Sequence, residues 1–195
     1  ILSPAQAAVL YLRRNFGNPA CHLIVAEETR ADFAEFPANH TNPDVIIVGD
    51  IDDRWNYAIL NRLFEMMMFG ATLIALHKGR YWQTGGGLRL DIGAFIAGLE
   101  YATGKEAVLI GKPSASFFEM ACADLNLPGD QIAMLGDDIE SDVGGAQAAG
   151  LRGVLVKTGK YRPALVARSS VRPDGVLASV GDLRDMSQSV QPGVK

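Results

Sequence analysis

The chain has 195 residues, 48% of them hydrophobic and 21% charged, which is enough to bury one good core or two small ones. Its net charge of -4 offers no basic footprint for nucleic acid, and it contains no run of about 18 apolar residues that could span a bilayer. Two cysteines are too few for a disulfide scaffold, so we expect a protein of the reducing cytoplasm.

The first 90 residues alternate between helical and extended patterns. Apolar residues at helical spacing predict helices over 4–16 and 56–69, and the second includes a methionine cluster that we expect to lie in a core. Short apolar runs, bounded by glycine or polar residues, predict strands over 21–26, 44–49 and 71–76. The region therefore predicts an α/β arrangement.

The last of these strands leads into a polar segment with two open interpretations. His77, Lys78, Arg80 and Tyr81 precede a glycine-rich loop at 85–87. They could contact a phosphorylated ligand, or they could belong to a solvated hairpin, which is the usual setting for such residues.

A helix over 92–102 follows, and then an apolar run over 107–110 that ends in Gly111 and Lys112. The run predicts a strand with a lysine at its carboxyl end. A lysine beside a proline is usually only solvated, so its meaning depends on what lies nearby. A further helix after Pro113 connects this strand to the next.

The stretch 131–150 combines a strand, an acidic turn and a helix. Its strand, 132–135, ends in a glycine that is followed by Asp137 and Asp138; the helix over 139–149 carries Asp142 in its first turn and ends at Gly150. Carboxylates crowded at the end of a strand favour a hard cation such as Mg²⁺, which would offset their repulsion. The alternative is that the first two aspartates form the turn and the third complements the helix dipole.

The order of these elements predicts where the lysine meets the carboxylates. If 107–110 and 132–135 are consecutive parallel strands of one sheet, their carboxyl ends lie at the same edge. Open α/β sheets bind ligands at that edge. We therefore expect the Lys112 ammonium within hydrogen-bond reach of Asp137 or Asp138.

Three motifs carry a specific resemblance: GKP at 111–113, GDDIESDVGGAQAAG at 136–150 and VLVKTGKY at 154–161. Together they resemble the later half of a haloacid dehalogenase-like hydrolase, in the branch with a large α/β cap that includes the nitrophenyl phosphatase-like proteins. The resemblance spans essentially the whole chain. It implies an α/β cap domain over 1–90 and, over 91–195, the C-terminal half of a doubly wound, Rossmann-like parallel-sheet core that lacks its N-terminal part.

The resemblance also implies roles for individual residues. Lys112 would be the catalytic and substrate-binding lysine of the third motif, and Asp137 the catalytic magnesium ligand of the fourth. Asp138 and Asp142 would support the metal directly or through water. The implied activity is Mg²⁺-dependent hydrolysis of a small phosphate ester, phosphoamide or pyrophosphate through an aspartyl-phosphate, and the cap implies a homodimer contact.

The nucleophile of that mechanism has no clear match. Asp50 and Asp52 have the D-x-D spacing of the first motif, but the small residues that should follow are absent, and strand 71–76 runs into His77 where the second motif has Ser or Thr. The cap resemblance of this region implies that the nucleophile precedes Ile1 and that these 195 residues alone do not turn over a phosphate ester. The alternative, that Asp50 is the nucleophile, stays open.

Two other functional classes also stay open. One is a catalytically silent binding protein that has kept the scaffold. The other is a phosphate-accepting receiver domain, which also uses an acidic pair and a lysine. Chain order opposes the receiver, because its lysine follows the acidic pair, whereas Lys112 precedes Asp137.

Overall fold

The computed structural model describes residues 3–183. The chain divides into two compact units between Gly111 and Lys112, which we call the first and the second unit and describe separately. Within residues 3–183, no helix combines the length and the apolar character needed to cross a membrane.

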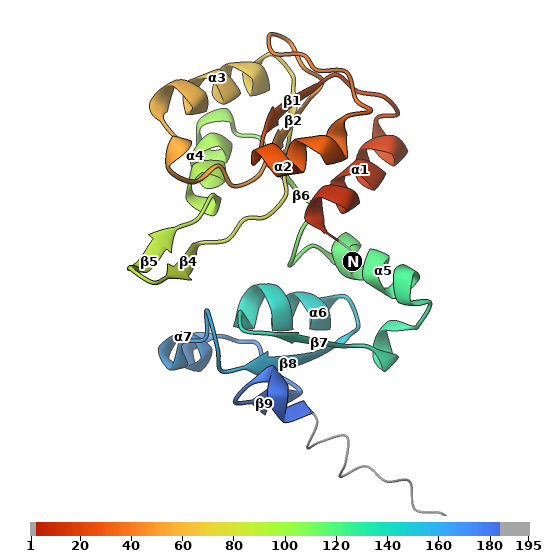
Figure 1. Cartoon of the computed structure of the whole chain (residues 1–195), viewed down its shortest axis with the longest axis vertical. Coiled ribbons are helices and arrows are strands. Elements are labelled where there is room, and N and C mark those ends of the chain that lie inside the picture. Colours follow the sequence, from red (N-terminus) through yellow and green to blue (C-terminus); the bar gives the residue numbers. More distant parts are fainter. Residues whose placement is uncertain (1–2, 184–195) are drawn as a thin grey trace, which may run out of the picture. The chain divides into compact units, whose positions relative to one another are not determined.

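The first unit is built on a parallel sheet with strand order β1-β2-β3-β6, of which β1, β2 and β6 are labelled in Figure 1. Its strands are β1 Cys21–Ile24, β2 Val45–Val48, β3 Thr72–Ala75 and β6 Val108–Leu109. The central strand β2 is VIIV, and all of it is buried, as expected for a parallel strand covered on both faces.

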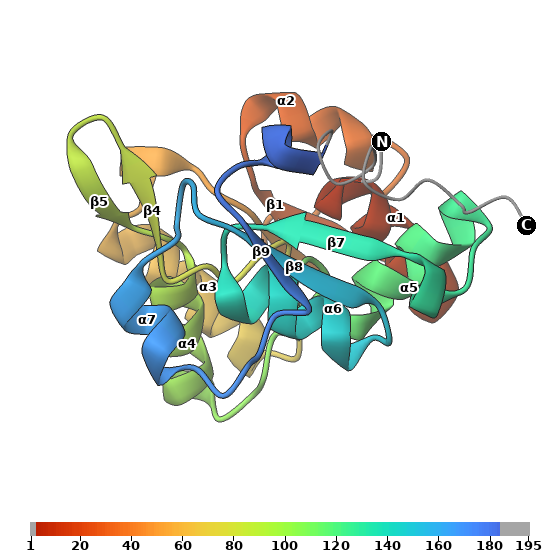
Figure 2. The same ribbon diagram turned by 90° about the horizontal axis from the view of Figure 1, so that it is seen from below.

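Helices cover both faces of this sheet. Helices α3 (Tyr57–Met68) and α4 (Gly93–Thr103) lie on one side, and α1 (Pro4–Asn15) and α2 (Glu27–Arg30) on the other (Figures 1 and 2). Because side chains alternate along a strand, Ile46 and Val48 share the face that packs against α3 and α4. The predicted methionine core is confirmed at Met67, which is buried in this cluster, but Met68, expected on the same stripe, is 55% exposed, and Met66 is buried in its place.

Short elements complete the first unit. Two 3-10 turns, η1 (Ala31–Phe33) and η2 (Asp52–Arg54), precede β2 and α3, and an antiparallel hairpin of β4 (Tyr81–Thr84) and β5 (Gly87–Leu90) precedes α4. The segment after β3 therefore forms the hairpin that the sequence left as one of two interpretations.

Helix α4 and strand β6 belong to the first unit. Helix α4 packs through Ile96 and Leu99 into the core of the first unit, and β6 pairs with β3. The expectation that strands 107–110 and 132–135 belong to one sheet is therefore wrong, because β6 and β7 are hydrogen-bonded into different sheets. A two-residue strand carries no pattern that identifies its partner, which is set instead by the packing of α4.

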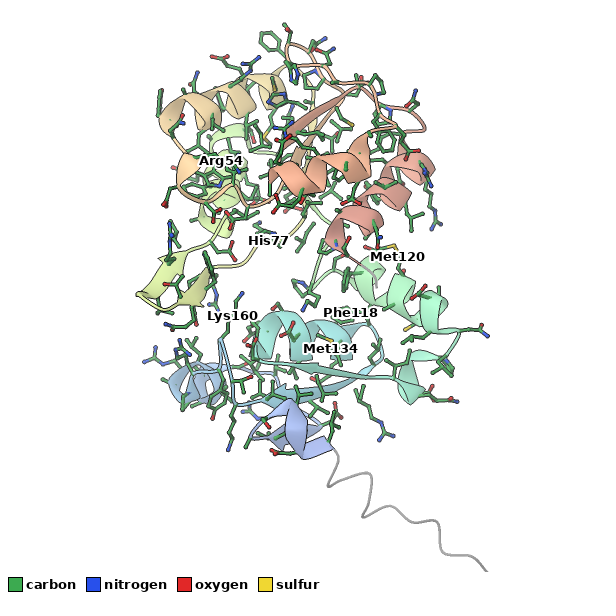
Figure 3. The ribbon with its side chains drawn as sticks, in the orientation of Figure 1. Arg54, His77, Phe118, Met120, Met134 and Lys160 are labelled. Carbon is green, nitrogen blue, oxygen red and sulfur yellow. The ribbon has the colours of Figure 1, made fainter. Side chains whose placement is uncertain are left out.

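The second unit has its own parallel sheet, in the order β7-β8-β9 (Figure 2). Its strands are β7 Ala133–Gly136, β8 Arg152–Val156 and β9 Gly175–Leu177, and its helical segments are α5 Ala115–Leu125, η3 Gly129–Gln131, η4 Ile139–Gly144, α6 Gly145–Ala148, α7 Pro163–Arg168 and η5 Val180–Asp182. Phe118 from α5 and Met134 from β7 pack around the buried Ala146 and Leu151 (Figure 3). Parallel strands connected by helices confirm the predicted α/β class.

Candidate functional site

The candidate site begins at the carboxyl end of β7, where Gly136 lies against Asp142. A Cβ atom on Gly136 would come within 2.2 Å of Asp142 Oδ2 and 2.3 Å of Asp142 Cβ. A side chain at this position would therefore displace the aspartate. The glycine is needed so that the helical segment after the turn can lie directly on the strand.

Asp138 caps that helical segment. It precedes η4, and its Oδ1 accepts hydrogen bonds of 3.1 Å from the backbone N–H groups of Glu140 and Ser141. These are two of the amide groups that a helix start leaves without an intrahelical partner. The segment η4 is a π-helical turn rather than the α-helix expected from the sequence, and α6 continues it.

Asp142 is buried and bound from two directions. Its Oδ1 lies 2.7 Å from Lys112 Nζ, and its Oδ2 accepts a 3.1 Å hydrogen bond from the backbone N–H of Asp138. The Asp142 side chain is 8% exposed and that of Lys112 is 36% exposed. One carboxylate is thus held between a cation and a backbone dipole, while part of the lysine remains open to solvent.

Lys112 reaches this carboxylate through a close contact, not through a shared sheet. Pro113 packs on α6 so closely that a Cβ on Gly145 would lie 2.7 Å from Pro113 Cβ. The Lys112 ammonium was expected beside Asp137 or Asp138, but it pairs with Asp142 instead. The expectation that lysine and carboxylates meet is confirmed, but the expected partner is wrong.

Asp137 points to the loop after β8. Its Oδ2 accepts a 3.1 Å hydrogen bond from the backbone N–H of Lys160, a residue labelled in Figure 3. Gly159 adopts φ +47°, and a Cβ there would lie 1.8 Å from the same oxygen. This loop was expected to have no role of its own. Its signal was the TGK run that follows β8, which meets the acidic turn because β7 and β8 are neighbours.

The contacts of the three aspartates bear on the expected metal. Among residues 3–183, no group of three or more His, Cys, Asp or Glu side chains is arranged to hold a metal ion. Asp142 has both oxygens engaged by protein groups. Within the same described range, Oδ1 of Asp137 and Oδ2 of Asp138 accept no hydrogen bond, so each could face a cation. Mg²⁺ is commonly held by one or two carboxylates with water and phosphate oxygens, so the turn fits part of such a site.

The D-x-D residues of the alternative interpretation lie in the first unit. Asp50 follows β2, and its Oδ1 accepts a 2.9 Å hydrogen bond from the Asp52 N–H. Asp52 adopts φ +54°, which is uncommon for a residue other than glycine. Lys112 and the three aspartates of the acidic turn all belong to the second unit.

Comparison with known proteins gives a consistent assignment. Residues 109–183 match the HAD-hydrolase-like family model. The chain is 37% identical over 188 residues to phospholysine phosphohistidine inorganic pyrophosphate phosphatase of Rattus norvegicus, covering 95% of this chain and 68% of that protein. It is 42% identical over 142 residues to haloacid dehalogenase-like hydrolase domain-containing protein 2 of Bos taurus, covering 73% of this chain and 54% of that protein.

A solved structure agrees with these relatives. The p-nitrophenyl phosphatase from Archaeoglobus fulgidus superposes with a TM-score of 0.86 at 25% identity, covering 97% of this chain and 74% of that one. The matches extend over both units and include the lysine, the acidic turn and the loop after β8. The chain therefore belongs to the haloacid dehalogenase-like hydrolases.

Proposed function

We propose that the protein is a Mg²⁺-dependent phosphatase that hydrolyses a small phosphorylated substrate. The substrate classes are those in the names of its relatives: a phosphate ester such as nitrophenyl phosphate, a phosphoamide such as phospholysine or phosphohistidine, or inorganic pyrophosphate. Fold alone does not select among them.

One observation carries the proposal: the Lys112 ammonium is fixed 2.7 Å from the buried Asp142 while its side chain stays 36% exposed. A lysine held in place in this way can donate its remaining N–H groups to phosphoryl oxygens. Its charge would stabilise the negative charge that develops on those oxygens in the transition state, without any reorganisation of the site. Asp142 would act as a positioning residue for the lysine.

Asp137 and Asp138 are the proposed metal-binding residues. When bound, Mg²⁺ would supply charge neutralisation for the phosphoryl oxygens and would orient them. The hydrogen bond from Lys160 N–H would hold the Asp137 carboxylate in one orientation, and the cap interactions would do the same for Asp138. Asp142, which the sequence analysis placed among the metal ligands, is left out of this set because Lys112 and the Asp138 N–H occupy its oxygens.

The proposed chemistry passes through a covalent intermediate. A carboxylate would attack phosphorus and form an aspartyl-phosphate, the leaving group would depart as it takes a proton from a second carboxylic acid, and water would then hydrolyse the acyl phosphate. We propose that both carboxylates belong to the parent protein ahead of Ile1. The silent binding protein remains the alternative to this activity, whereas the receiver domain is dropped because the matches are to hydrolases.

The proposed location is the reducing cytoplasm. Cys21 and Cys122 are both free, and burial raises the pKa of the Cys21 thiol to about 11, which keeps it in the unreactive protonated form.

The test compares the 195-residue chain with its parent protein on p-nitrophenyl phosphate, with Mg²⁺ or with a chelator. We expect turnover by the parent alone, its loss on chelation, and its loss in the parent carrying Lys112→Ala. Arg152→Ala is the matched control, because this exposed basic residue begins β8 at the end of the sheet opposite the site. Turnover by the 195-residue chain that Asp50→Asn abolishes would instead make Asp50 the nucleophile. An inactive parent would favour the silent binding protein.

A further inference from the structure

A second candidate binding site lies wholly within the first unit. A pocket of about 400 Å³ opens between η2, the β4–β5 hairpin and the start of α4. Pockets of this size hold small organic ligands. The residues that line it are Asp50, Asp52, Asp53, Trp55, Trp82, Arg89, Leu90, Ile92 and Phe95.

The lining is acidic. Asp50, Asp52 and Asp53 contribute three carboxylates, and Arg89 contributes the one cation among the lining residues, which leaves an excess of two negative charges. Arg54, in the same 3-10 turn and labelled in Figure 3, does not line the pocket; its Nε donates to the backbone oxygen of Ile51 at 3.0 Å. The pocket therefore favours a positively charged ligand.

The walls are aromatic. Trp55 stacks on Phe95 with ring centroids 4.8 Å apart and an interplanar angle of 21°. Trp82 forms another wall, from the hairpin. Aromatic faces beside carboxylates attract organic cations, because the ring faces carry negative charge density and also bury an apolar stem.

The protein already places one of its own cations in this setting. The guanidinium of Arg89 is ion-paired with Asp53, and its carbon lies 5.9 Å from the centre of the Trp82 ring. The pair is largely exposed, with side chains 45% and 83% open to solvent, and it shows one cation of this chain lying between a carboxylate and an indole. Because Arg89 is engaged by Asp53, the carboxylates of Asp50 and Asp52 remain as the charges that face a ligand.

We propose that this pocket binds an organic cation on an apolar stem, an ammonium or guanidinium group of the size of a lysine or arginine side chain. The carboxylate of Asp52 pairs with the cationic head, and the two indoles pack along the stem. The inference does not rest on the phosphatase activity, because binding in the first unit needs neither Lys112 nor the acidic turn of the second unit.

Ligand binding to this pocket can be followed by the intrinsic fluorescence of the chain. The chain contains two tryptophans, and both line the pocket, so intrinsic fluorescence reports on occupancy without any turnover. The 195-residue chain is titrated with n-butylammonium and n-butylguanidinium, and in parallel with n-butanol, butyrate and inorganic phosphate. We expect a saturable change with the two cations at millimolar concentration, weakened several-fold by 0.5 M salt because charge attraction is screened.

Three variants test whether the carboxylates of the pocket attract the cationic ligand. Asp52→Asn should weaken cation binding about tenfold while keeping the backbone, since Asn also tolerates a positive φ. Asp124→Asn, an exposed aspartate on α5 of the second unit, should change nothing. Arg89→Gln should tighten cation binding several-fold, because it removes the internal competitor from Asp53.

The direction in which Arg89→Gln changes ligand affinity distinguishes a cation site from an anion site. Saturable binding of butyrate or phosphate that Arg89→Gln abolishes would overturn the proposal and make the pocket an anion site. Equal responses to butylammonium and butanol would also overturn it, because they would show apolar binding without charge recognition. Far-UV circular dichroism of each variant confirms that the fold is retained before its titration is compared with that of the wild type.

Discussion

The ion pair between Lys112 and Asp142 predicts an asymmetric response to the loss of its two members. Lys112→Met removes the cation and leaves the Asp142 carboxylate, 8% exposed, with only the Asp138 N–H as a partner. Asp142→Asn leaves Lys112, whose side chain is 36% exposed and can turn to water. The lysine variant should therefore be the less stable of the two.

The magnitudes follow from burial. Breaking a buried pair by removing one partner costs about 3 to 5 kcal/mol, and exposed pairs contribute about 1 kcal/mol or less. This pair lies between these limits because one member is buried and the other is more than a third exposed. We expect Lys112→Met to lower the free energy of unfolding by about 2 to 3 kcal/mol. Asp142→Asn should cost about 1 to 1.5 kcal/mol, the value of one ordinary hydrogen bond, because Asn still accepts from the Asp138 N–H and the partly exposed Lys112 can turn to water.

Urea unfolding of both single variants and of the double variant tests these values. Far-UV circular dichroism reports on the whole chain, whereas tryptophan fluorescence reports on the first unit, because both tryptophans belong to it. At a typical slope of about 2 kcal/mol per molar urea, Lys112→Met should lower the midpoint of the second unit by about 1 M. The reasoning fails if Asp142→Asn is as costly as Lys112→Met, or if the double-mutant cycle gives a coupling near zero.

Three further outcomes are expected. Asp137→Asn in the parent protein should raise the Mg²⁺ concentration for half-maximal activity at least tenfold, because an anionic oxygen leaves a site with few protein ligands; an unchanged Mg²⁺ titration would contradict the assignment. The pKa of His22 is lowered from 6.5 to about 4, chiefly by burial. Since the unfolded state then binds a proton more readily than the folded state, the free energy of unfolding decreases as pH falls from 6.5 towards 4. Between pH 7 and pH 5 this loss should reach about 2 kcal/mol, and His22→Asn should remove it from urea unfolding curves followed by tryptophan fluorescence. Phe69, 83% exposed at the end of α3, is our proposed homodimer contact; Phe69→Ser should lower the mass measured by light scattering, and a wild-type monomer at every concentration would refute the dimer.

The secondary structure of the first unit could be predicted closely because its signals are local. Helix α3 starts where Asn56 caps it, with its side chain accepting from the Ile59 N–H, and its apolar face has the spacing of one buried stripe. The run VIIV is central and buried because nothing in it is polar. Local patterns did not show that α4 and β6 belong to this unit, because that depends on the packing of Ile96 and Leu99 against α3 and the sheet.

The sequence predicted which residues form the candidate site, but not which of them contact one another. The sequence places Lys112 and the acidic turn beside strand ends, and the motif resemblance names them together. It gives no distance, so it could not show that Asp138 would be used as a helix cap or that Asp142 would take the lysine. The helical period did identify the inner face, because Val143 and Ala146 are both fully buried.

The missing information lies in the glycines around this turn. A Cβ on Gly136 would strike Asp142, one on Gly145 would strike Pro113, and one on Gly153 would lie 2.7 Å from a methyl carbon of Val143. Each glycine removes a side chain where the segment η4–α6 meets β7, β8 or the residues after Lys112. The segment can therefore approach on all three sides, and this approach buries Asp142 beneath the turn within reach of the lysine. Of the three glycines, the sequence pattern identifies only Gly136, as the start of a turn; the close contacts at Gly145 and Gly153 become visible only in the folded chain.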